Sequence, residues 1–520
     1  MKFIISLFFL FLFFGAKAQI TWSSHIAPIL YNKCSSCHHS SGAGHSDLTN
    51  YDTAVYNAAA INYYTVQRQM PPWPPNINYK RYAHERVLSQ QEIDDIQSWV
   101  MNATPIGDTT LLPPKPIYTG SAILTQTPDN TFQMPNFTIP NVGGTDIYWN
   151  FPIATNFLTS KFISGFEFLP GNTEQVHHAL IYVDSGNTTL NNDAAYLGPG
   201  YPGFGGVNSS TAKLIGAFVP GTTPFIFPSA FGMRLPANAV IIFSMHYPAG
   251  SVGQMDSSKI NLFLAPTATR EIFFEAPLNH GSNLINGPLF IPANTTKIFE
   301  SQYTVPIDIS VFGVAPHMHL IGKSIKAFGI SPSNDSIPFI DIPNWDFRWQ
   351  GAYYFQKIMK LSAGTKTYAI ANYDNTTANL NNPNNPPLNV SLGENTNDEM
   401  LLVYFPYTKY QLGDENIILD SAAVLASNED IFHLFKKIEF FPCFPNPTSD
   451  ELILKYYTAN LEELYYYIND MQGKTIFQSQ KRKSIGYQTE KISLANLPSG
   501  TYFITLQTNA EKKVQKVVKE

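Results

Sequence analysis

The chain has 520 residues and a net charge of −6, with charged residues making up 14% of the total. A chain this long exceeds one ordinary hydrophobic core, so about three or four domains are expected. The negative charge and the lack of a basic tract argue against nucleic acid as a partner. Aromatic residues also make up 14%, and 38 prolines and 32 glycines supply turns, so short strands are favoured over long helices.

The first 18 residues predict a secretory signal peptide. The stretch MKFIISLFFLFLFFGAKA contains a lysine, an apolar run of about a dozen residues, and an A-x-A-like end at Ala16-Lys17-Ala18, after which cleavage is expected. The run is short for a membrane span, so a membrane anchor is the weaker alternative. No later stretch is long and apolar enough to cross a bilayer. We therefore expect an exported mature chain without a transmembrane segment.

Residues 19–110 are expected to form a small helical domain. The stretch TWSSHIAPILYNKC has the apolar spacing of a helix. Ser89 is followed three residues later by Glu92, which is the pattern of a capping box at a helix start. The apolar face of that second helix is expected to carry Ile93, Ile96 and Val100.

A dense group of cysteines and histidines, NKCSSCHHSSGAGH, starts at Asn32. Cys34, Cys37 and His38 form the C-x-x-C-H pattern of c-type haem attachment, in which the thiols bond the porphyrin and the histidine binds the iron. A zinc ribbon would need a second cysteine pair, and a redox dithiol would need a βαβ context. The third cysteine, Cys443, is expected to be incidental, so disulfides are not expected to hold this fold.

The second axial ligand of this haem is expected to be a methionine or histidine further along the chain. Met70, in RQMPPWPP, lies in a Pro-rich stretch that cannot be helical and that could hold a thioether over the iron. The alternatives are His39, His45 and His84, or a plain core role for Met70. His39 and His45 are otherwise expected to face solvent. C-x-x-C-H, MPPW and the closing capped helix together resemble a small cytochrome c module, which favours Met70.

A Pro-rich connector at 111–118 leads into strand-like, turn-rich sequence that continues to about residue 425, as in HALIYVD, NAVIIFSMHYP and KTYAIANYD. Outside the first domain histidines are scarce, and most fall at four places: His177 with His178, His246, His280, and His317 with His319. Strand alternation would place His317 and His319 on one face, where both could bind one ion. His177 and His178 are adjacent, so their joint ligation requires a bend. Any one of these histidines alone could be an ordinary core residue.

This histidine set and the later DEM sequence closely resemble the copper type II, ascorbate-dependent monooxygenases, the group of peptidylglycine α-hydroxylating monooxygenase and dopamine β-monooxygenase. The similar stretches are GTTPFIFPSAFGMRLPANAVIIFSMHYPAG, IPNWDFRWQGAYYF, NYDNTTANLNNPNNPP and GENTNDEM, and bacterial members with an N-terminal cytochrome domain are the most similar. The resemblance implies a multidomain, mainly β protein. Two antiparallel, jelly-roll-like β-sandwich domains, at 118–275 and 276–425, would each supply one copper across a solvent-filled cleft.

The resemblance also implies two separate ligand sets. An electron-transfer copper would be held by His177, His178 and His246. A catalytic copper would be held by His317, His319 and Met400. Imidazole binds both copper oxidation states and thioether favours Cu(I), which suits these roles. Asp398 and Glu399 are expected to support the ligands or the fold rather than to act as a base.

The implied reaction is hydroxylation of a C–H bond of a small organic substrate by O₂, with two electrons consumed per turnover. The electrons would come from ascorbate or another one-electron reductant, including an external redox partner, and the haem c domain would pass them to the two copper ions. In the peptide-amidating members an arginine two residues before H-x-H anchors a substrate carboxylate, and here that position is Ala315. Their substrate-contacting asparagine is replaced by Leu402, whereas their tyrosine persists as Tyr404, our candidate substrate contact. These departures favour a more apolar or neutral substrate.

Residues 440–520 resemble the type A sorting domain of type IX secretion, a small C-terminal β-sandwich. The similar stretches are PNPTSDELILKY, YINDMQGKTIF and LANLPSGTYFITL, with KKVQKVVKE at the end. Any small β module is the plain alternative. The resemblance implies export through the periplasm and then by the type IX machinery, to the cell surface or the medium.

The leading functional hypothesis is therefore a secreted haem- and copper-dependent monooxygenase. The alternative is a non-catalytic surface protein that transfers electrons or binds copper. A scaffold that had lost catalysis would have no chemical reason to keep all six copper ligands, which argues against this alternative. A third hypothesis, a carbohydrate-binding β-sandwich, would need neither the H-x-H sequence nor Met400.

Overall fold

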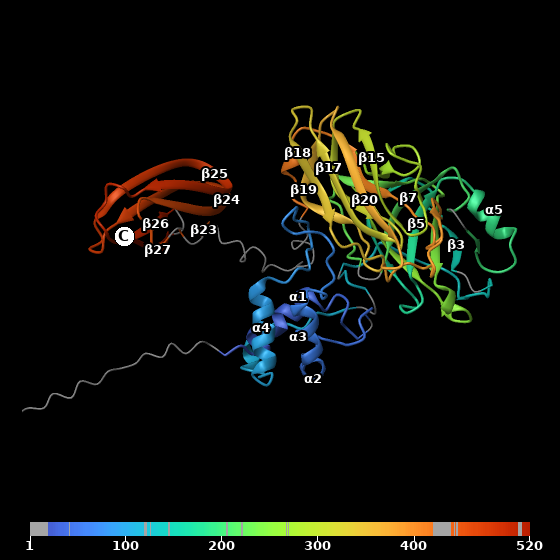
Figure 1. Ribbon diagram of the computed structural model, residues 1–520, viewed down its shortest axis with the longest axis horizontal. Coiled ribbons are helices and arrows are strands. Elements are labelled where there is room, and N and C mark those ends of the chain that lie inside the picture. The colour runs from blue at the N-terminus through green and yellow to red at the C-terminus, as the bar shows by residue number, and fades with distance from the viewer. Residues whose placement is uncertain are drawn as a thin grey trace, which may run out of the picture. The chain divides into compact units, whose positions relative to one another are not determined.

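The computed structural model divides into two compact units, Met1–Ala422 and Ala423–Glu520 (Figure 1). The described residues are 19–520, without 41, 119–121, 125, 144–145, 204–205, 220–221, 267, 269, 420–437, 441–442, 444–445 and 508–511. The expected signal peptide lies outside them. The protein is mainly β, as its composition predicts. No helix in the described ranges is long and apolar enough to cross a membrane.

Four of the five α-helices described in the first unit belong to its N-terminal segment and are drawn in blue in Figure 1, whereas α5 (Thr188–Ala194) lies among the strands in sequence. The N-terminal segment contains a π-helical turn (Trp22–Ile26), α1 (Ala27–Lys33), α2 (Tyr51–Tyr56), α3 (Ala58–Val66) and α4 (Gln90–Met101), followed by a 3₁₀ turn (Thr109–Leu111). The expected capping box of α4 is confirmed, because the Glu92 N–H donates to Ser89 Oγ (3.2 Å) and the Ser89 N–H donates to Glu92 Oε2 (2.7 Å). These helices share a buried core that includes Trp22, Leu30 and Trp99.

Two five-stranded sheets follow. The first has the order β1 (Asn130–Gln133), β11 (Lys259–Leu264), β4 (Lys161–Leu169), β8 (Phe231–Leu235), β12 (Arg270–Glu271). The second has the order β6 (Tyr201–Pro202), β3 (Ile147–Ala154), β9 (Val240–Tyr247), β5 (His178–Asp184), β7 (Ala212–Phe218). Side chains of both sheets, such as Ile163, Ile260, Ile181 and Phe243, form one buried cluster, so the sheets pack face to face. The small elements are β2 (Phe137–Thr138), α5 (Thr188–Ala194), a 3₁₀ turn (Ala249–Ser251) and β10 (Met255–Asp256).

Two four-stranded antiparallel sheets complete the first unit. One has the order β13 (Phe273–Asn279), β22 (Leu402–Lys409), β16 (Ile309–His317), β19 (Tyr353–Leu361). The other has the order β15 (Thr295–Thr304), β20 (Lys366–Asn375), β17 (Gly322–Ile330), β18 (Ser336–Ile342). Residues along β20 alternate between buried and more exposed positions, which is the pattern of a strand with one face in a core. The remaining elements are β14 (Phe290–Ile291), β21 (Val390–Ser391) and a 3₁₀ turn (Asp414–Asn416).

The segment between α3 and α4 attaches the helices to the second pair of sheets. The Tyr82 hydroxyl donates to the Phe339 carbonyl (2.7 Å), and its ring is 2% exposed. The Ala83 N–H donates to the Tyr354 carbonyl (2.8 Å), and the Asn76 N–H donates to the Asp341 carbonyl (2.8 Å). The helical segment is therefore bound to the β-sheets through buried side-chain and backbone contacts.

The second unit is one sheet built from β23 (Ile438–Phe440), β24 (Glu451–Asn469), β25 (Thr475–Ser493), β26 (Gly500–Gln507) and β27 (Lys512–Lys519). Leu452, Leu454 and Ile504 are in its buried core, together with Cys443, which has no disulfide partner. The Cys443 N–H donates to Gln515 Oε1 (2.8 Å). The β-rich C-terminal segment expected from the sequence is confirmed, and Cys443 serves in its packing.

Candidate metal centres and the cavity between them

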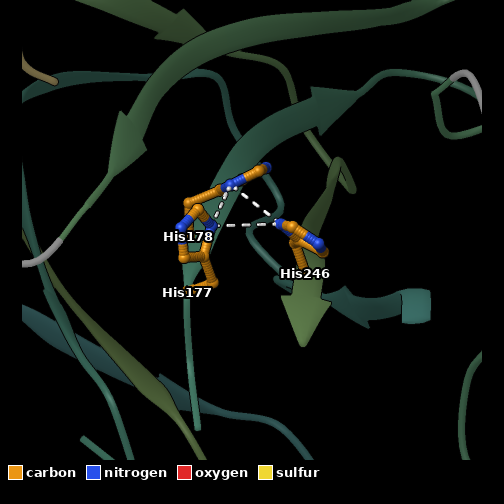
Figure 2. A group of neighbouring side chains, drawn as sticks. All are labelled: His177, His178 and His246. Atoms are coloured by element: carbon orange, nitrogen blue, oxygen red, sulfur yellow. Dashed lines mark hydrogen bonds between the residues drawn. The ribbon is translucent and has the colours of Figure 1, made fainter. Parts of the chain in front are cut away.

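Three histidines converge on the second five-stranded sheet (Figure 2). His178 opens β5 and is paired in register with His246 on β9, so the two side chains are direct cross-strand neighbours. His177 lies just before β5, and its N–H donates to the His246 carbonyl (3.1 Å). The strand starts at the second residue of the pair, so the regular alternation that would separate the two imidazoles does not apply. The three imidazoles can meet because His177 lies outside the regular strand.

The spacing of the three rings suits a shared metal ion. The Nδ1 atom of His177 lies 3.2 Å from that of His178 and 3.2 Å from that of His246, and the last two are 3.1 Å apart. Two imidazoles bound at about 2.0 Å and at a tetrahedral angle would hold their nitrogens about 3.3 Å apart. Burial lowers the pKa of His177 to about 4 and also lowers the pKa of His178 well below its usual value, which keeps the neutral, metal-binding form at pH 7.

The Asp146 carboxylate lies next to His246, on the side of the ring that faces away from His177 and His178. Asp146 Oδ2 lies 3.1 Å from His246 Nε2 but off the N–H axis. The buried Nε2 atom therefore has a carboxylate nearby without a well-aligned hydrogen bond to it. The contact with His246 holds the Asp146 pKa at about 2. Asp146 also accepts hydrogen bonds from Thr396 Oγ1 (2.7 Å) and the Ala249 N–H (3.3 Å). Tyr148 stacks on the His246 ring at 4.4 Å.

His317 and His319 form a second pair, with ring centroids 5.0 Å apart. The sequence predicts that strand alternation brings the two rings together. This reason is wrong, because β16 ends at His317 and His319 lies in the following turn. His317 Nδ1 lies 2.6 Å from Gln350 Oε1, and the Gln350 amide nitrogen donates to the Phe347 carbonyl, which fixes the amide orientation. His319 Nδ1 lies 3.1 Å from the Asp398 carbonyl. Both partners are acceptors, so both Nδ1 atoms carry the proton and both Nε2 lone pairs are available to a metal.

Met400 is held beside this pair by the buried carboxylate of Glu399. Glu399 accepts the backbone N–H groups of His319 (2.9 Å), Ile321 (3.0 Å) and Met400 (3.1 Å). Burial raises the pKa of Glu399 to about 8, against the opposing effect of these donors. The expectation that Glu399 has a supporting role fits these contacts, since it ties the turn after β16 to the segment that carries the methionine.

One cavity of about 430 Å³ is lined by side chains of both groups. It is bordered by His178, His246, His317, His319, Met400 and Tyr404. Ala315 and Leu402, at the two positions that depart from the peptide-amidating enzymes, also line it. The Phe347 ring stacks on His177 (5.2 Å) and meets His319 edge-on (5.8 Å), so one aromatic side chain contacts both groups. Five of the six expected copper ligands and Tyr404 therefore line a single cavity, and the sixth, His177, has its Nδ1 atom 3.2 Å from those of His178 and His246.

The C-x-x-C-H residues lie at the end of α1 and in the turns that follow. Cys34 and Cys37 form no disulfide. His38 Nδ1 lies 3.3 Å from the Ser46 carbonyl, which places its proton there and leaves Nε2 free. Free thiols and an oriented imidazole fit covalent haem attachment. Met70 is half-buried, and no described contact joins it to His38, so its role as the distal ligand stays a prediction.

The expectation that His39 faces solvent is wrong. Its ring is 4% exposed, stacks on Tyr118 at 4.0 Å, and its Nδ1 contacts the Ser35 carbonyl (2.7 Å). Tyr118 belongs to the Pro-rich connector, so the burial of His39 depends on a segment about 80 residues away, which local sequence patterns do not show. His45 is exposed, as expected.

Sequence reasoning did not single out Asp146, Phe347 or Gln350. Phe347 and Gln350 fall within the stretch IPNWDFRWQGAYYF, which resembles the monooxygenase family but marks neither residue as functional. No local pattern marks Asp146. Carboxylate and amide side chains that orient a ligand are distant from it in sequence, so they are found only once the fold is known.

Comparisons with known proteins support the C-terminal domain directly. Residues 442–520 match the family model described as "Secretion system C-terminal sorting domain". This domain directs export by the type IX secretion machinery, to the cell surface or the medium. No curated protein matches the chain.

Three solved structures that align with the chain have low identity and low TM-scores. A biofilm-associated protein, BSP domain, aligns over 78% of this chain and 84% of that chain, with 9% identity and a TM-score of 0.20. The β-glucuronidase of Faecalibacterium prausnitzii aligns over 46% of this chain and 40% of that chain, with 11% identity and a TM-score of 0.13. The β-glucuronidase of Parabacteroides merdae aligns over 50% and 31%, with 9% identity and a TM-score of 0.12. Similarity this low carries no argument about function.

Proposed function

We propose that this exported protein is a haem- and copper-dependent monooxygenase that hydroxylates a C–H bond of a small organic substrate with O₂. The observation that carries the proposal is the pairing of two different ligand groups around one cavity. One group offers three Nδ1 atoms 3.1 to 3.2 Å apart, and the other offers two oriented imidazoles beside a buried methionine. A simple copper-storage protein has no need for such different groups on one cavity.

The ligand chemistry separates the roles of the two groups. His177, His178 and His246 would hold a copper with imidazole alone, and His317, His319 and Met400 would hold a copper with a thioether. Bound copper would supply one-electron redox chemistry and activation of O₂ at these positions. Gln350 and the Asp398 carbonyl orient the two imidazoles of the second group, and Glu399 fixes the backbone that joins them to Met400. The chain thereby prepares the ligands before any metal binds.

The N-terminal helical segment is proposed to be a cytochrome c domain that supplies the electrons. Cys34, Cys37, His38 and Met70 would hold the haem. Cys37 lines a small cavity together with Thr222 and Pro224, and these two residues also line the large cavity. The haem attachment site and the cavity are therefore separated by one short chain segment, which supports direct delivery of single electrons.

The test uses the full mature chain loaded with haem and copper. It is reduced and then mixed with O₂ and a pool of candidate metabolites. We expect substrate-dependent reoxidation of the haem, followed with a stopped-flow spectrometer, and ¹⁸O from ¹⁸O₂ in the product, measured by mass spectrometry. His317→Ala should abolish both signals, whereas the exposed control Asp52→Asn should keep them.

Two results would contradict the proposal. Haem reoxidation that is unchanged in His317→Ala would show that the electrons do not pass to the second ligand group. Two bound coppers per chain without O₂ consumption or labelled product would identify the protein as a non-catalytic copper-binding or electron-transfer protein.

A further inference from the structure

We propose that the cavity binds a neutral, largely aromatic molecule, and that His280 positions it by donating a hydrogen bond from Nε2 to an oxygen acceptor on that molecule. This inference rests on the proposed function for the identity of the site. It adds the chemical class of the substrate and a residue that belongs to neither ligand group.

His280 follows the last residue of β13 and is fixed by a reciprocal pair of bonds to Leu401. The His280 N–H donates to the Leu401 carbonyl (2.9 Å), and the Leu401 N–H donates to His280 Nδ1 (3.0 Å). Because Nδ1 accepts a backbone N–H, the neutral ring must carry its proton on Nε2. Leu401 directly follows Met400, so this imidazole is held next to the second ligand group.

The Nε2–H of His280 is available to a ligand. The ring lines the cavity and is half-buried, and the described residues provide no hydrogen-bond partner for Nε2. The cavity walls are mostly apolar, so few protein acceptors compete for this N–H group. An acceptor on the bound molecule would therefore strengthen binding by forming a hydrogen bond with it. The fixed tautomer means that this site selects an acceptor and not a donor.

The side chains that line the cavity indicate the chemistry of the rest of the bound molecule. Its aromatic side chains include Phe225, Phe227, Phe274, Phe347, Tyr354 and Tyr404. Phe274 and Tyr404 stack on each other at 5.3 Å and offer a flat apolar surface. No lysine or arginine is among the lining residues, and Glu394 is their only carboxylate. An anion would find no cationic side chain to pair with in these walls, and a cation would lie beside the bound copper ions, so the side chains of the cavity favour a neutral molecule.

The experiment measures binding to the copper-loaded full chain in its oxidised state without reductant, where no turnover occurs. Isothermal titration calorimetry compares four probes that share a phenyl ring: phenylacetone, isobutylbenzene, phenylacetate and 2-phenylethylammonium. We expect phenylacetone to bind about fivefold to tenfold more tightly than isobutylbenzene, the gain from one hydrogen bond. Phenylacetate and the ammonium probe are expected to bind more weakly than phenylacetone.

A variant then assigns the preference to His280. His280→Phe keeps an aromatic ring and removes the donor, so phenylacetone and isobutylbenzene should bind with equal affinity. The matched control, His45→Phe, changes an exposed histidine outside the cavity and should keep the preference. Circular dichroism and copper content establish that each variant is folded and loaded.

Several results would overturn the inference. Equal affinity for isobutylbenzene and phenylacetone would show that the cavity does not recognise a hydrogen-bond acceptor. This comparison uses the unsubstituted protein and does not depend on any variant. Tightest binding of either charged probe would exclude a neutral substrate class. A preference for phenylacetone that survives in His280→Phe would place the donor elsewhere. Calorimetric binding does not require product formation. Binding of phenylacetone without any ¹⁸O-labelled product would contradict the proposed hydroxylation but not this inference.

Discussion

At the scale of single residues, the side chains around the candidate metal-binding histidines decide which ring nitrogen would face a metal. In the three-histidine group the Nδ1 atoms converge, and Asp146 lies behind His246 at Nε2. In the second group Nδ1 is occupied by Gln350 or by a backbone carbonyl, so Nε2 is presented instead. The same residue type is thus used in two orientations, each set by its neighbours.

Asp146→Asn tests this effect at His246. The substitution removes the negative charge beside Nε2 and keeps an oxygen that can accept from Thr396. Loss of a carboxylate that supports a metal-bound histidine typically costs about 10-fold to 100-fold in metal affinity, so we expect that weakening at the three-histidine group alone. Competition with a copper chelator, followed by electron paramagnetic resonance, resolves the two groups. The exposed control Asp52→Asn should bind copper normally, and equal affinities in the two variants would refute the role of Asp146.

At the scale of elements, the second ligand group depends on the junction of two chain segments. His317 ends β16, His319 lies in the turn that follows, and Met400 lies just before β22. The Glu399 carboxylate receives N–H groups from both segments, and its side chain is fully buried. A short turn held this way presents its histidines in one geometry, whereas a free turn would sample many.

Glu399→Ala should therefore destabilise the protein. It leaves three buried N–H groups without their acceptor, and each such loss costs about 1–3 kcal/mol when water does not replace it. We expect the free energy of unfolding of the copper-free chain to fall by at least about 2 kcal/mol, measured by denaturant titration. Glu174→Ala, at an exposed position, should change it by less than about 0.5 kcal/mol. Equal stability of the two variants would contradict the structural role of Glu399.

At the scale of the whole molecule, burial of many imidazoles in the Met1–Ala422 unit couples its stability to pH. Burial lowers the pKa of His177 and His317 to about 4 and that of His319 to about 3. In the unfolded chain these groups return to about 6.5. Between these values the unfolded chain binds more protons than the folded chain, so acid favours unfolding.

The copper-free chain should accordingly lose stability as the pH falls from about 6.5 toward 4, and its stability should be insensitive to these groups above pH 7. Each histidine contributes a slope of about 1.4 kcal/mol per pH unit within that window. Denaturant titrations across the pH range measure the slope, and His319→Gln should make it shallower. Equal slopes in the unsubstituted chain and in His319→Gln would show that this imidazole is not buried in the neutral form.

The sequence by itself determined the features that depend on local chemistry. The capping box at Ser89, the C-x-x-C-H spacing and the C-terminal sorting domain are each contained in one short stretch or one small domain. The two expected ligand sets came from the family resemblance, since any one of these histidines alone could be an ordinary core residue.

The tertiary structure decided what depends on contacts between distant segments. The register of β5 against β9 brings His178 to His246 across 68 positions, and the connector buries His39 against Tyr118. The placement of Asp146, Phe347 and His280 around one cavity follows from the same kind of long-range packing. The sequence gives the residue type at each position. The atom that a side chain presents to a site depends on neighbouring residues that come together only when the chain folds.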